Sequence, residues 1–372
     1  MDLNNAKMEE VANTDIASTF EALAPLPIPL YLNQCVTYKQ EILVCGGNSE
    51  GGCYSYHLLK NQYKYICSYP SNVELRGHCV VKCVNNNNPD EITLLSFGGQ
   101  GKHKKHTLMM KYVSIWDNLE VEDKRNFNRW VPFIDSRNKQ ILIGRDDDNY
   151  IGARAVISGS RNHLLFITYY PNNISVYDLS TFQFVKHSTL PNRMFIGYHC
   201  FVSKTENVSS AMKRYANNTQ NELILFCKST GLSIEYDEDK QKLYFNKLRI
   251  CTALRQFISY GFIRINDFIV LFGGNDNSNT TASGEIYKYS LTENKWIKFE
   301  QNLPIPLTDC AVAVSENSAY LHIIGGFDGK EALLSHVKIK METLIQQEET
   351  ETEKRGLQKK KKKKKLRTLK KN

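Results

Sequence analysis

The segment Leu26-Pro27-Ile28-Pro29-Leu30 recurs letter for letter as Leu303-Pro304-Ile305-Pro306-Leu307, 277 residues later in the chain. Between the two copies the sequence repeats one unit. Each unit has an apolar run that often ends in Gly-Gly, then a Tyr, and seven residues further on a second large apolar side chain. Repetition at a period of about fifty residues indicates the architecture before any single motif is weighed.

The repeated positions fall into two sets. The double glycines are Gly46-Gly47, Gly98-Gly99, Gly273-Gly274 and Gly325-Gly326, each directly after an apolar run. The spaced pairs are Tyr56 and Tyr63, Tyr177 and Phe184, Tyr236 and Leu243, and Tyr289 and Trp296. Two further units, with apolar runs at 163–168 and 222–227, lack the double glycine. The second unit keeps Trp130, although an insertion stretches its distance from Tyr112.

The chemistry of these positions predicts the fold. A continuous run of five or six apolar residues indicates a strand that is buried on both faces. Gly-Gly directly after such a strand permits a tight exit at positive φ. The Tyr and the second large side chain then fall on successive strands and are expected to pack between neighbouring sheets. Together these features predict a β-propeller in which each repeat forms one blade.

The double glycine and the spaced Tyr and Trp resemble the kelch repeat over roughly residues 19–344. The fifth and sixth units fit best, the first and second fit well, and the third and fourth are degenerate. The resemblance implies an all-β, six-bladed kelch-type propeller. It also implies a role in binding proteins, because the loop face of kelch propellers commonly holds partner peptides.

The two copies of the proline-containing segment also predict how the ring closes. The sixth unit, from Thr308 to about Leu344, has no outer strand of its own. Residues 20–23 precede the first copy just as residues 296–299 precede the second. Residues 19–24 are therefore predicted to form the outermost strand of the last blade, which removes an exposed sheet edge. The predicted organisation is a disordered segment at 1–18, a propeller at 19–345 and a disordered Lys-rich tail at 346–372.

Composition sets the broad class of protein. Hydrophobic residues make up 41% of the chain and aromatic residues 11%, which is enough for a large core. No apolar stretch approaches the roughly eighteen residues of a membrane-spanning helix. Residues 1–18 contain no secretory hydrophobic region. We therefore expect a cytoplasmic protein, monomeric as a propeller, whose ten cysteines are reduced thiols.

The net charge of +9 arises at the C-terminal end. Residues 354–372 hold twelve Lys or Arg, seven of them consecutive at 359–365, and no acidic residue. Without this stretch the chain has 36 basic and 39 acidic residues, so the propeller is nearly neutral. Two interpretations stay open. The basic run either contacts nucleic acid or an anionic surface, or acts as a nuclear-import signal, or it is a low-complexity expansion without a dedicated partner.

Two residue groups have metal-like composition. Cys79 and Cys83, beside His78, are expected on the first strand of the second blade, where a buried structural thiol is the more common arrangement. The run Asp146-Asp147-Asp148 lacks the spaced oxygen ligands and the Gly of a calcium loop. It is expected to be a solvated acidic loop.

Kelch-like folds also include enzymes. The nearest approach to the Glu-x3-Asp-x3-His iron motif of kelch-type specifier proteins is Glu235 and Asp239, but Leu243 stands where the His is needed. Sialic-acid epimerases also use six kelch-like blades, so an enzyme of that kind is a minor alternative. We expect no catalytic, cofactor or metal site.

The expected binding surface is one face of the ring. The loop that leaves the second strand of a blade and the loop that enters the first strand lie on the same face. Partner-binding residues are predicted there at Lys102, His103, Lys104, Lys105, His106, Arg145, Asp146, Asp147, Asp148, Asn275, Asp276 and Asp328. Residues 48–50 lie on the same face. The alternative interpretation is that the basic and acidic loops neutralise each other, with each exposed pair contributing well under ~1 kcal/mol.

The sequence therefore favours a non-catalytic scaffold that binds an unidentified protein partner through its loop face. The alternative is a nucleic-acid or chromatin-associated protein tethered by its poly-Lys tail. A ubiquitin-ligase adaptor is a further minor alternative. Because only about eighteen residues precede the first expected strand, such an adaptor needs a separate recruiting protein.

Overall fold

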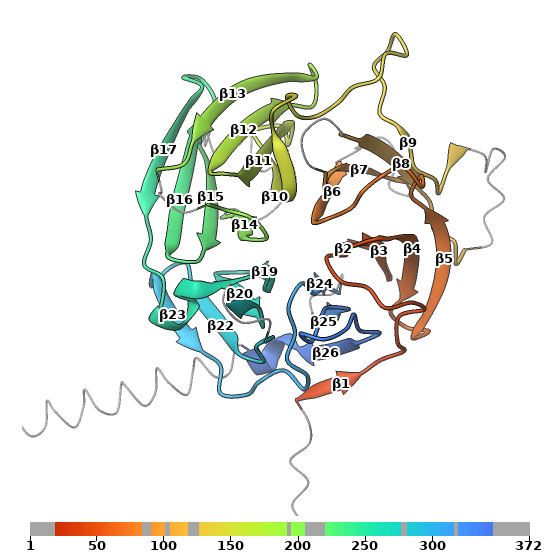
Figure 1. Cartoon of the computed structure of the whole chain (residues 1–372), viewed down its shortest axis with the longest axis vertical. Coiled ribbons are helices and arrows are strands. Elements are labelled where there is room, and N and C mark those ends of the chain that lie inside the picture. The colour runs from red at the N-terminus through yellow and green to blue at the C-terminus, as the bar shows by residue number, and fades with distance from the viewer. Residues whose placement is uncertain are drawn as a thin grey trace, which may run out of the picture.

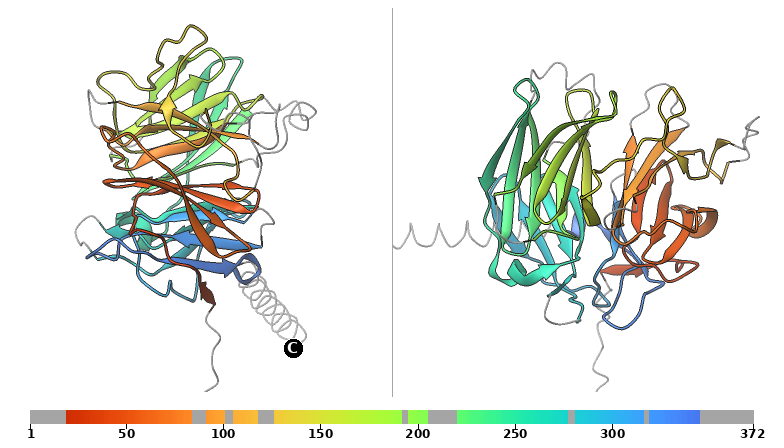
Figure 2. Two further views of the ribbon diagram at one scale, coloured as in Figure 1. Left: turned by 90° about the vertical axis from the view of Figure 1, so that its right-hand side faces the viewer. Right: turned by 45° about the horizontal axis from the view of Figure 1, so that its top comes forward.

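Six four-stranded antiparallel sheets surround a central axis in the computed structural model (Figure 1). It describes residues 19–83, 91–100, 105–117, 126–191, 195–204, 220–276, 281–315 and 319–344. Each sheet is one blade, and neighbouring sheets pack face to face around the ring, as further views of the molecule show (Figure 2). The predicted all-β, six-bladed propeller is confirmed.

The first three blades follow the chain from the innermost strand to the outermost. The first contains β2 (Gln34–Tyr38), β3 (Glu41–Gly47), β4 (Glu50–His57) and β5 (Gln62–Ser68). The second contains β6 (His78–Cys83), β7 (Ile92–Gly98), β8 (Thr107–Tyr112) and β9 (Val131–Pro132). The third contains β10 (Asn149–Ser158), β11 (Leu164–Tyr170), β12 (Asn173–Asp178) and β13 (Gln183–Thr189).

The other three blades keep this order up to the last strand. The fourth contains β14 (Cys200–Ser203), β15 (Gln220–Cys227), β16 (Thr230–Asp237) and β17 (Lys242–Lys247). The fifth contains β19 (Gly261–Ile265), β20 (Phe268–Phe272), β22 (Ile286–Ser290) and β23 (Lys295–Lys298). The sixth contains β24 (Ala311–Val314), β25 (Tyr320–Ile324), β26 (His336–Lys340) and β1 (Phe20–Ala22). The degenerate third and fourth units are therefore complete blades.

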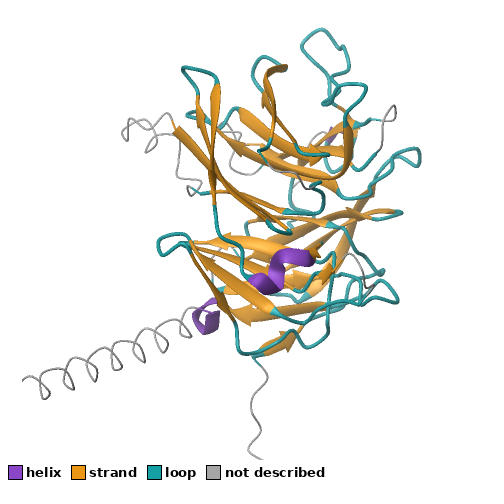
Figure 3. Ribbon diagram, turned by 60° about the vertical axis from the view of Figure 1, so that its left-hand side comes forward, coloured by secondary structure: helices purple, strands orange, loops and turns teal. Residues whose placement is uncertain are grey.

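Two smaller features lie outside this plan. A two-stranded sheet joins β18 (Phe257–Ile258) to β21 (Asn275–Asp276). Within the described residues, the helical segments are short, such as η2 (Thr252–Gln256) and the turn at 341–344 (Figure 3). None of them is long and apolar enough to cross a membrane.

The ring closes by pairing its two ends, as predicted. Strand β1 adds to the outer edge of β26, with Phe20 opposite Ile339 and Ala22 opposite Val337. Phe20 is buried in the core of the last blade. The otherwise open edge of β26 thus has its backbone hydrogen bonds satisfied, which removes a template for pairing with other chains.

The two copies of the proline-containing segment make the same connection between neighbouring blades. Each copy leads from an outermost strand to the next blade's innermost strand and passes over the double glycine of the blade it leaves. The amide of Gly274 donates to the carbonyl of Leu307 at 2.8 Å, and the amide of Gly326 donates to Leu30 at 2.8 Å. The sequence repeat therefore reports a repeated backbone contact at the fifth and sixth blades.

These contacts explain why glycine is needed after the second strand. Seven of the eight double-glycine residues have positive φ, from +57° at Gly46 to +115° at Gly326, and Gly47 is the exception. A Cβ atom on Gly273 would collide with the carbonyl oxygen of Leu307. Only glycine meets both demands without strain. The prediction of a tight exit at positive φ is confirmed for the seven.

The spaced aromatic pairs are cross-strand neighbours, as predicted. Tyr289 faces Trp296 in the register of β22 and β23, and their ring centroids lie 5.0 Å apart. The ring of Phe226, from the fourth blade, lies 4.8 Å from each of these two rings. Trp130 stacks on Tyr69 at 4.6 Å in the core between the first and second blades. Edge-to-face and offset aromatic contacts of this kind hold blades together beyond the area that they bury.

The cysteines are free thiols in this structure. Cys79 and Cys83 lie on the first strand of the second blade, as expected, and the thiol of Cys79 donates to the carbonyl of Ala153 at 3.3 Å. Among the described residues, no group of three or more His, Cys, Asp or Glu is arranged to hold a metal ion. Two further expectations, the tail at 346–372 and the segment 1–18, lie outside the described residues.

Candidate functional site

The two loops that the sequence placed on one face are in contact. The ammonium of Lys105 donates to the backbone carbonyl of Arg145. Burial lowers the pKa of Lys105, and the charges of Asp148, Asp146 and Asp147 oppose that shift. The contact therefore joins the two loops through a backbone carbonyl, while the Arg145 guanidinium pairs with Asp148 inside its own loop. Lys102, His103 and Lys104 lie outside the described residues.

Two of the predicted binding residues are buried, so the expectation of exposed loops is wrong for them. Asp148 is 4% exposed, because its carboxylate accepts from the backbone amide of Arg145 at 2.9 Å and from its guanidinium at 2.9 Å. Burial alone would raise the pKa of Asp148, but these bonds hold it below its usual value. His106 is 5% exposed and lies 3.4 Å from the Ser96 hydroxyl. Asp146 and Asp147 are exposed, as expected of an acidic loop.

The remaining predicted residues have structural contacts. Asn275 and Asp276 form strand β21, so they are held in a short sheet instead of a free loop. The carboxylate of Asp328 accepts from the amides of Lys330 and Glu331 at 2.7 and 2.8 Å and fixes a turn. These residues lie on the expected face, but the structure does not bring them together with Lys105 and Arg145 into one cluster.

A ring of left-handed residues surrounds the mouth of the central channel. Each blade contributes one residue at or just before its innermost strand, with φ between +51° and +66°. The six are Leu32, Gly77, Gly152, Tyr198, Ser259 and Asp309. Left-handed conformation is unfavourable for Leu and Tyr, and residues held in it concentrate at functional sites.

Backbone hydrogen bonds hold this ring from blade to blade. The donors and acceptors are Leu32 to Asp309 (2.8 Å), Asp309 to Ser259 (2.6 Å), Ser259 to Tyr198 (3.0 Å), Tyr198 to Gly152 (2.8 Å), and Gly152 to Arg76 (3.2 Å). Five bonds thus join six blades in sequence around the axis. Because the backbone is fixed in this way, the ring positions its side chains rigidly on the loop face.

Asp309 is the acidic member of the ring. Burial raises the pKa of its carboxyl to about 6, although the Ser259 hydroxyl, the Arg154 charge and the Thr308 hydroxyl all favour the ionised form. The Thr308 hydroxyl lies 3.4 Å from the carboxyl oxygen. Beside it, the ring of Tyr198 covers Gly77 and Gly152, where a Cβ would approach to 2.7 and 2.9 Å. The mouth therefore combines a titratable acid with a large aromatic surface.

A hollow of about 760 Å³ opens on the same face, between the first and second blades. The turn from β3 to β4 forms one side, and the connection from β5 to β6 forms the other. Its charged and polar lining includes Asn48, Ser49, Glu50, Glu74 and Arg76. Arg76 belongs to both features, since its carbonyl accepts from the ring and its side chain lines the hollow.

Comparisons with known proteins identify the fold and no more. No family model matches the chain, and no curated protein matches it. Solved structures do match, among them "Structure of YjhT" at 14% sequence identity and a TM-score of 0.58. That match covers 86% of this chain and 97% of the other. The shared feature is the propeller. The kelch resemblance remains a prediction that the repeated motifs carry, and a shared fold does not assign a function.

None of the six ring residues stood out in the sequence. Their identities differ from blade to blade, and left-handed conformation is visible in a sequence mainly at glycine. A weak signal exists in Gly77-His78-Cys79 and Tyr198-His199-Cys200, which occupy equivalent positions before two inner strands. Both histidines are buried, and each directly follows a ring residue, so the His-Cys pair marks equivalent positions in the two blades.

Proposed function

We propose that this chain is a non-catalytic scaffold that binds a protein partner on its loop face. The observation that carries the proposal is the 760 Å³ hollow beside the rigid ring of the channel mouth. A hollow of this size accepts side chains of a partner, and the fixed backbone around it limits the entropy lost on binding. The kelch resemblance favours the same face.

The charges of the hollow suit a partner of mixed polarity. Glu50 and Arg76 are exposed at its rim, where they favour specificity and association rate more than affinity. The rings of Tyr54 and Tyr69, both largely buried, provide apolar walls, and aromatic walls of this kind anchor partner side chains.

The proposal is tested with two matched charge reversals. Glu50→Lys changes the hollow, and Glu293→Lys changes an exposed position in the turn between β22 and β23, on the opposite face. We expect proteins captured from cell extract by the wild-type chain to be retained by Glu293→Lys, lost with Glu50→Lys and retained after removal of residues 354–372. If the Glu50→Lys variant captured the same proteins as the wild type, binding at this hollow would be refuted.

The basic run at 354–372 supports a second candidate function, binding to nucleic acid or another anionic surface. Binding of this kind releases counterions, so it weakens steeply as salt concentration rises. We expect a double-stranded DNA probe to bind the full chain at low salt, to dissociate at moderate salt and not to bind residues 1–350. Salt-resistant binding by residues 1–350 would instead place the nucleic-acid site on the propeller.

A further inference from the structure

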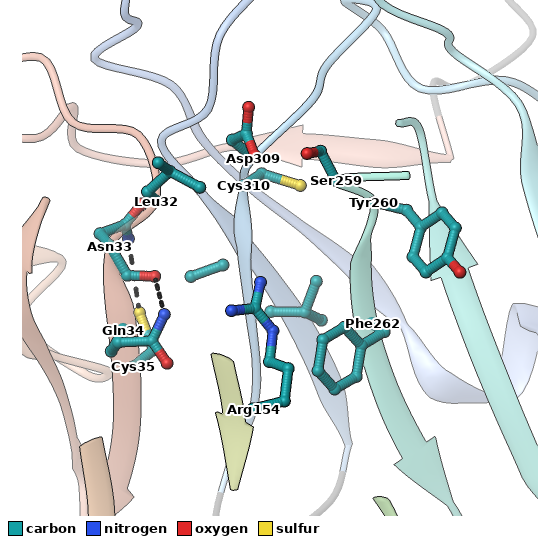
Figure 4. Close-up of a pocket in the computed structure, with 12 residues that line it drawn as sticks. Leu32, Asn33, Gln34, Cys35, Arg154, Ser259, Tyr260, Phe262, Asp309 and Cys310 are labelled. Atoms are coloured by element: carbon teal, nitrogen blue, oxygen red, sulfur yellow. Dashed lines mark hydrogen bonds between the residues drawn. The ribbon is translucent and has the colours of Figure 1, made fainter. Parts of the chain in front are cut away.

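A small cavity lies in the mouth of the central channel, just inside the ring (Figure 4). Its volume is about 180 Å³, which is room for a molecule of a few heavy atoms. The innermost strands β2, β10, β19 and β24 contribute to its walls. Among the twelve described residues that line it, Arg154 is the basic side chain and Asp309 the acidic one.

The guanidinium of Arg154 projects into the middle of this cavity (Figure 4). One of its faces lies over the ring of Phe262, at 5.8 Å from the centroid. It donates one hydrogen bond to the described residues, at 2.9 Å to the carbonyl of its neighbour Ala153. No described carboxylate lies within ion-pair distance. Since a guanidinium has five donors, most of its edge is available to a ligand.

The fold itself does not require a cation at this position. The equivalent residues on the other innermost strands are Gln34, Cys79, Cys200, Gly261 and Ala311. All five are uncharged, and they support the same blade geometry. Half-burying a guanidinium without an anion is unfavourable, so its presence in one blade of six points to a ligand.

The surroundings limit the charge of that ligand. The Asp309 carboxyl is held by Ser259 and Thr308 and remains at the rim, where it repels a second anion. A dianion such as phosphate would meet this repulsion with both charges. A carboxylate has a single charge and matches the planar fork of Arg with two parallel hydrogen bonds.

We propose that the channel mouth is a binding site for a small monocarboxylate ion, with Arg154 as its two-point partner and Phe262 as its apolar wall. This site is independent of the partner-binding hollow between the first and second blades. Loss of either one would leave the other intact.

The proposal implies a definite pH dependence. The Arg154 charge acts on the Asp309 carboxyl, which the Ser259 and Thr308 hydroxyls also bond. The neighbouring Tyr198 feels the charges of Asp309, Arg154, Arg76 and Tyr31. Because the pKa of Asp309 lies at about 6, its charge is absent well below that pH and present above it. Carboxylate affinity therefore rises as pH falls through about 6, until the ligand itself is protonated.

Isothermal titration of the full chain with sodium acetate tests the site, with acetamide as the uncharged control of the same shape. We expect acetate to bind, acetamide not to bind, and Arg154→Gln to weaken acetate binding at least tenfold. Asp309→Asn is expected to bind acetate at pH 8 as tightly as the wild type does at pH 5. This second variant keeps the test sharp if Arg154→Gln does not fold.

Three results would overturn the proposal. They are the absence of acetate binding at pH 5, equal acetate affinity in Arg154→Gln and wild type, and phosphate binding tighter than acetate binding at pH 8. A wild-type affinity that does not change between pH 5 and 8 would remove the assigned role of Asp309.

Discussion

Replacing Asp309 with Asn is expected to stabilise the protein, by an amount that depends on pH. Burial holds the pKa of this carboxyl at about 6 in the folded chain, against an ordinary value of 3.8 for an Asp carboxyl in water. Between these values the folded chain keeps a proton that the unfolded chain has lost, so stability falls as pH rises through this window. This gap between the folded and unfolded pKa predicts that Asp309→Asn raises the free energy of unfolding by about 3 kcal/mol above pH 7. At pH 4 the predicted gain is well under ~1 kcal/mol.

Asn suits this position for two further reasons. It tolerates left-handed backbone, and Asp309 has a φ of +56°. Its amide oxygen can still accept from the Ser259 or Thr308 hydroxyl. The assay is urea unfolding of wild type and Asp309→Asn at pH 4 and pH 8. Because both proteins share every other titrating group, the effects of those groups cancel when the wild-type free energy of unfolding is subtracted from that of the variant. Asp146→Asn, at an exposed position, is the control and should change stability by less than ~0.5 kcal/mol at both pH values. A gain that is equal at pH 4 and pH 8, or a loss at pH 8, would refute the reasoning.

Three other substitutions probe the closure, the strand exits and the buried histidines, each by urea unfolding. Gly273→Ala should destabilise the protein by more than ~2 kcal/mol, because the position has a φ of +64° and the added Cβ would collide with backbone. In the control Gly284→Ala the added Cβ would have its nearest atom 3.5 Å away, so stability should change little. Similar losses for the two variants would contradict this. Phe20→Ala should cost about 3 kcal/mol, because it removes one buried ring from the core of the last blade. Glu21→Ala, which removes an exposed ion pair, should cost less than ~1 kcal/mol, and a small loss for Phe20→Ala would mean that β1 does not close the ring. Burial lowers the pKa of His322 to about 4, so the unfolded chain binds a proton first and wild-type stability falls as pH drops from about 6.5 to 4. His322→Gln should flatten that fall by about 3 kcal/mol, and parallel pH profiles would count against it.

Much of the fold was predictable because its information is local and repeated. Each motif involves only a few neighbouring residues: the double glycine, the spaced aromatic pair or the apolar run. Because the unit occurs six times, the clear copies reveal the pattern that the degenerate third and fourth units keep only in part. Closure by residues 19–24 was predictable for the same reason, since the segment at Leu26 repeats the one at Leu303. The candidate site was harder to predict. His106 and Asp148 were expected on exposed loops, and their burial follows from contacts with Ser96 and Arg145 that no local pattern encodes.

The sequence by itself determined the number of blades, their order and the pairing of the chain's two ends, because these depend on a repeated pattern within each strand. Only the tertiary structure decided which side chains meet at the axis. Arg154 and Asp309 are 155 residues apart, and they share a cavity because six inner strands converge there. The burial that raises the pKa of Asp309 to about 6 is likewise a property of the assembled ring. Burial and convergence arise from all six blades packing together, so no single repeat contains them.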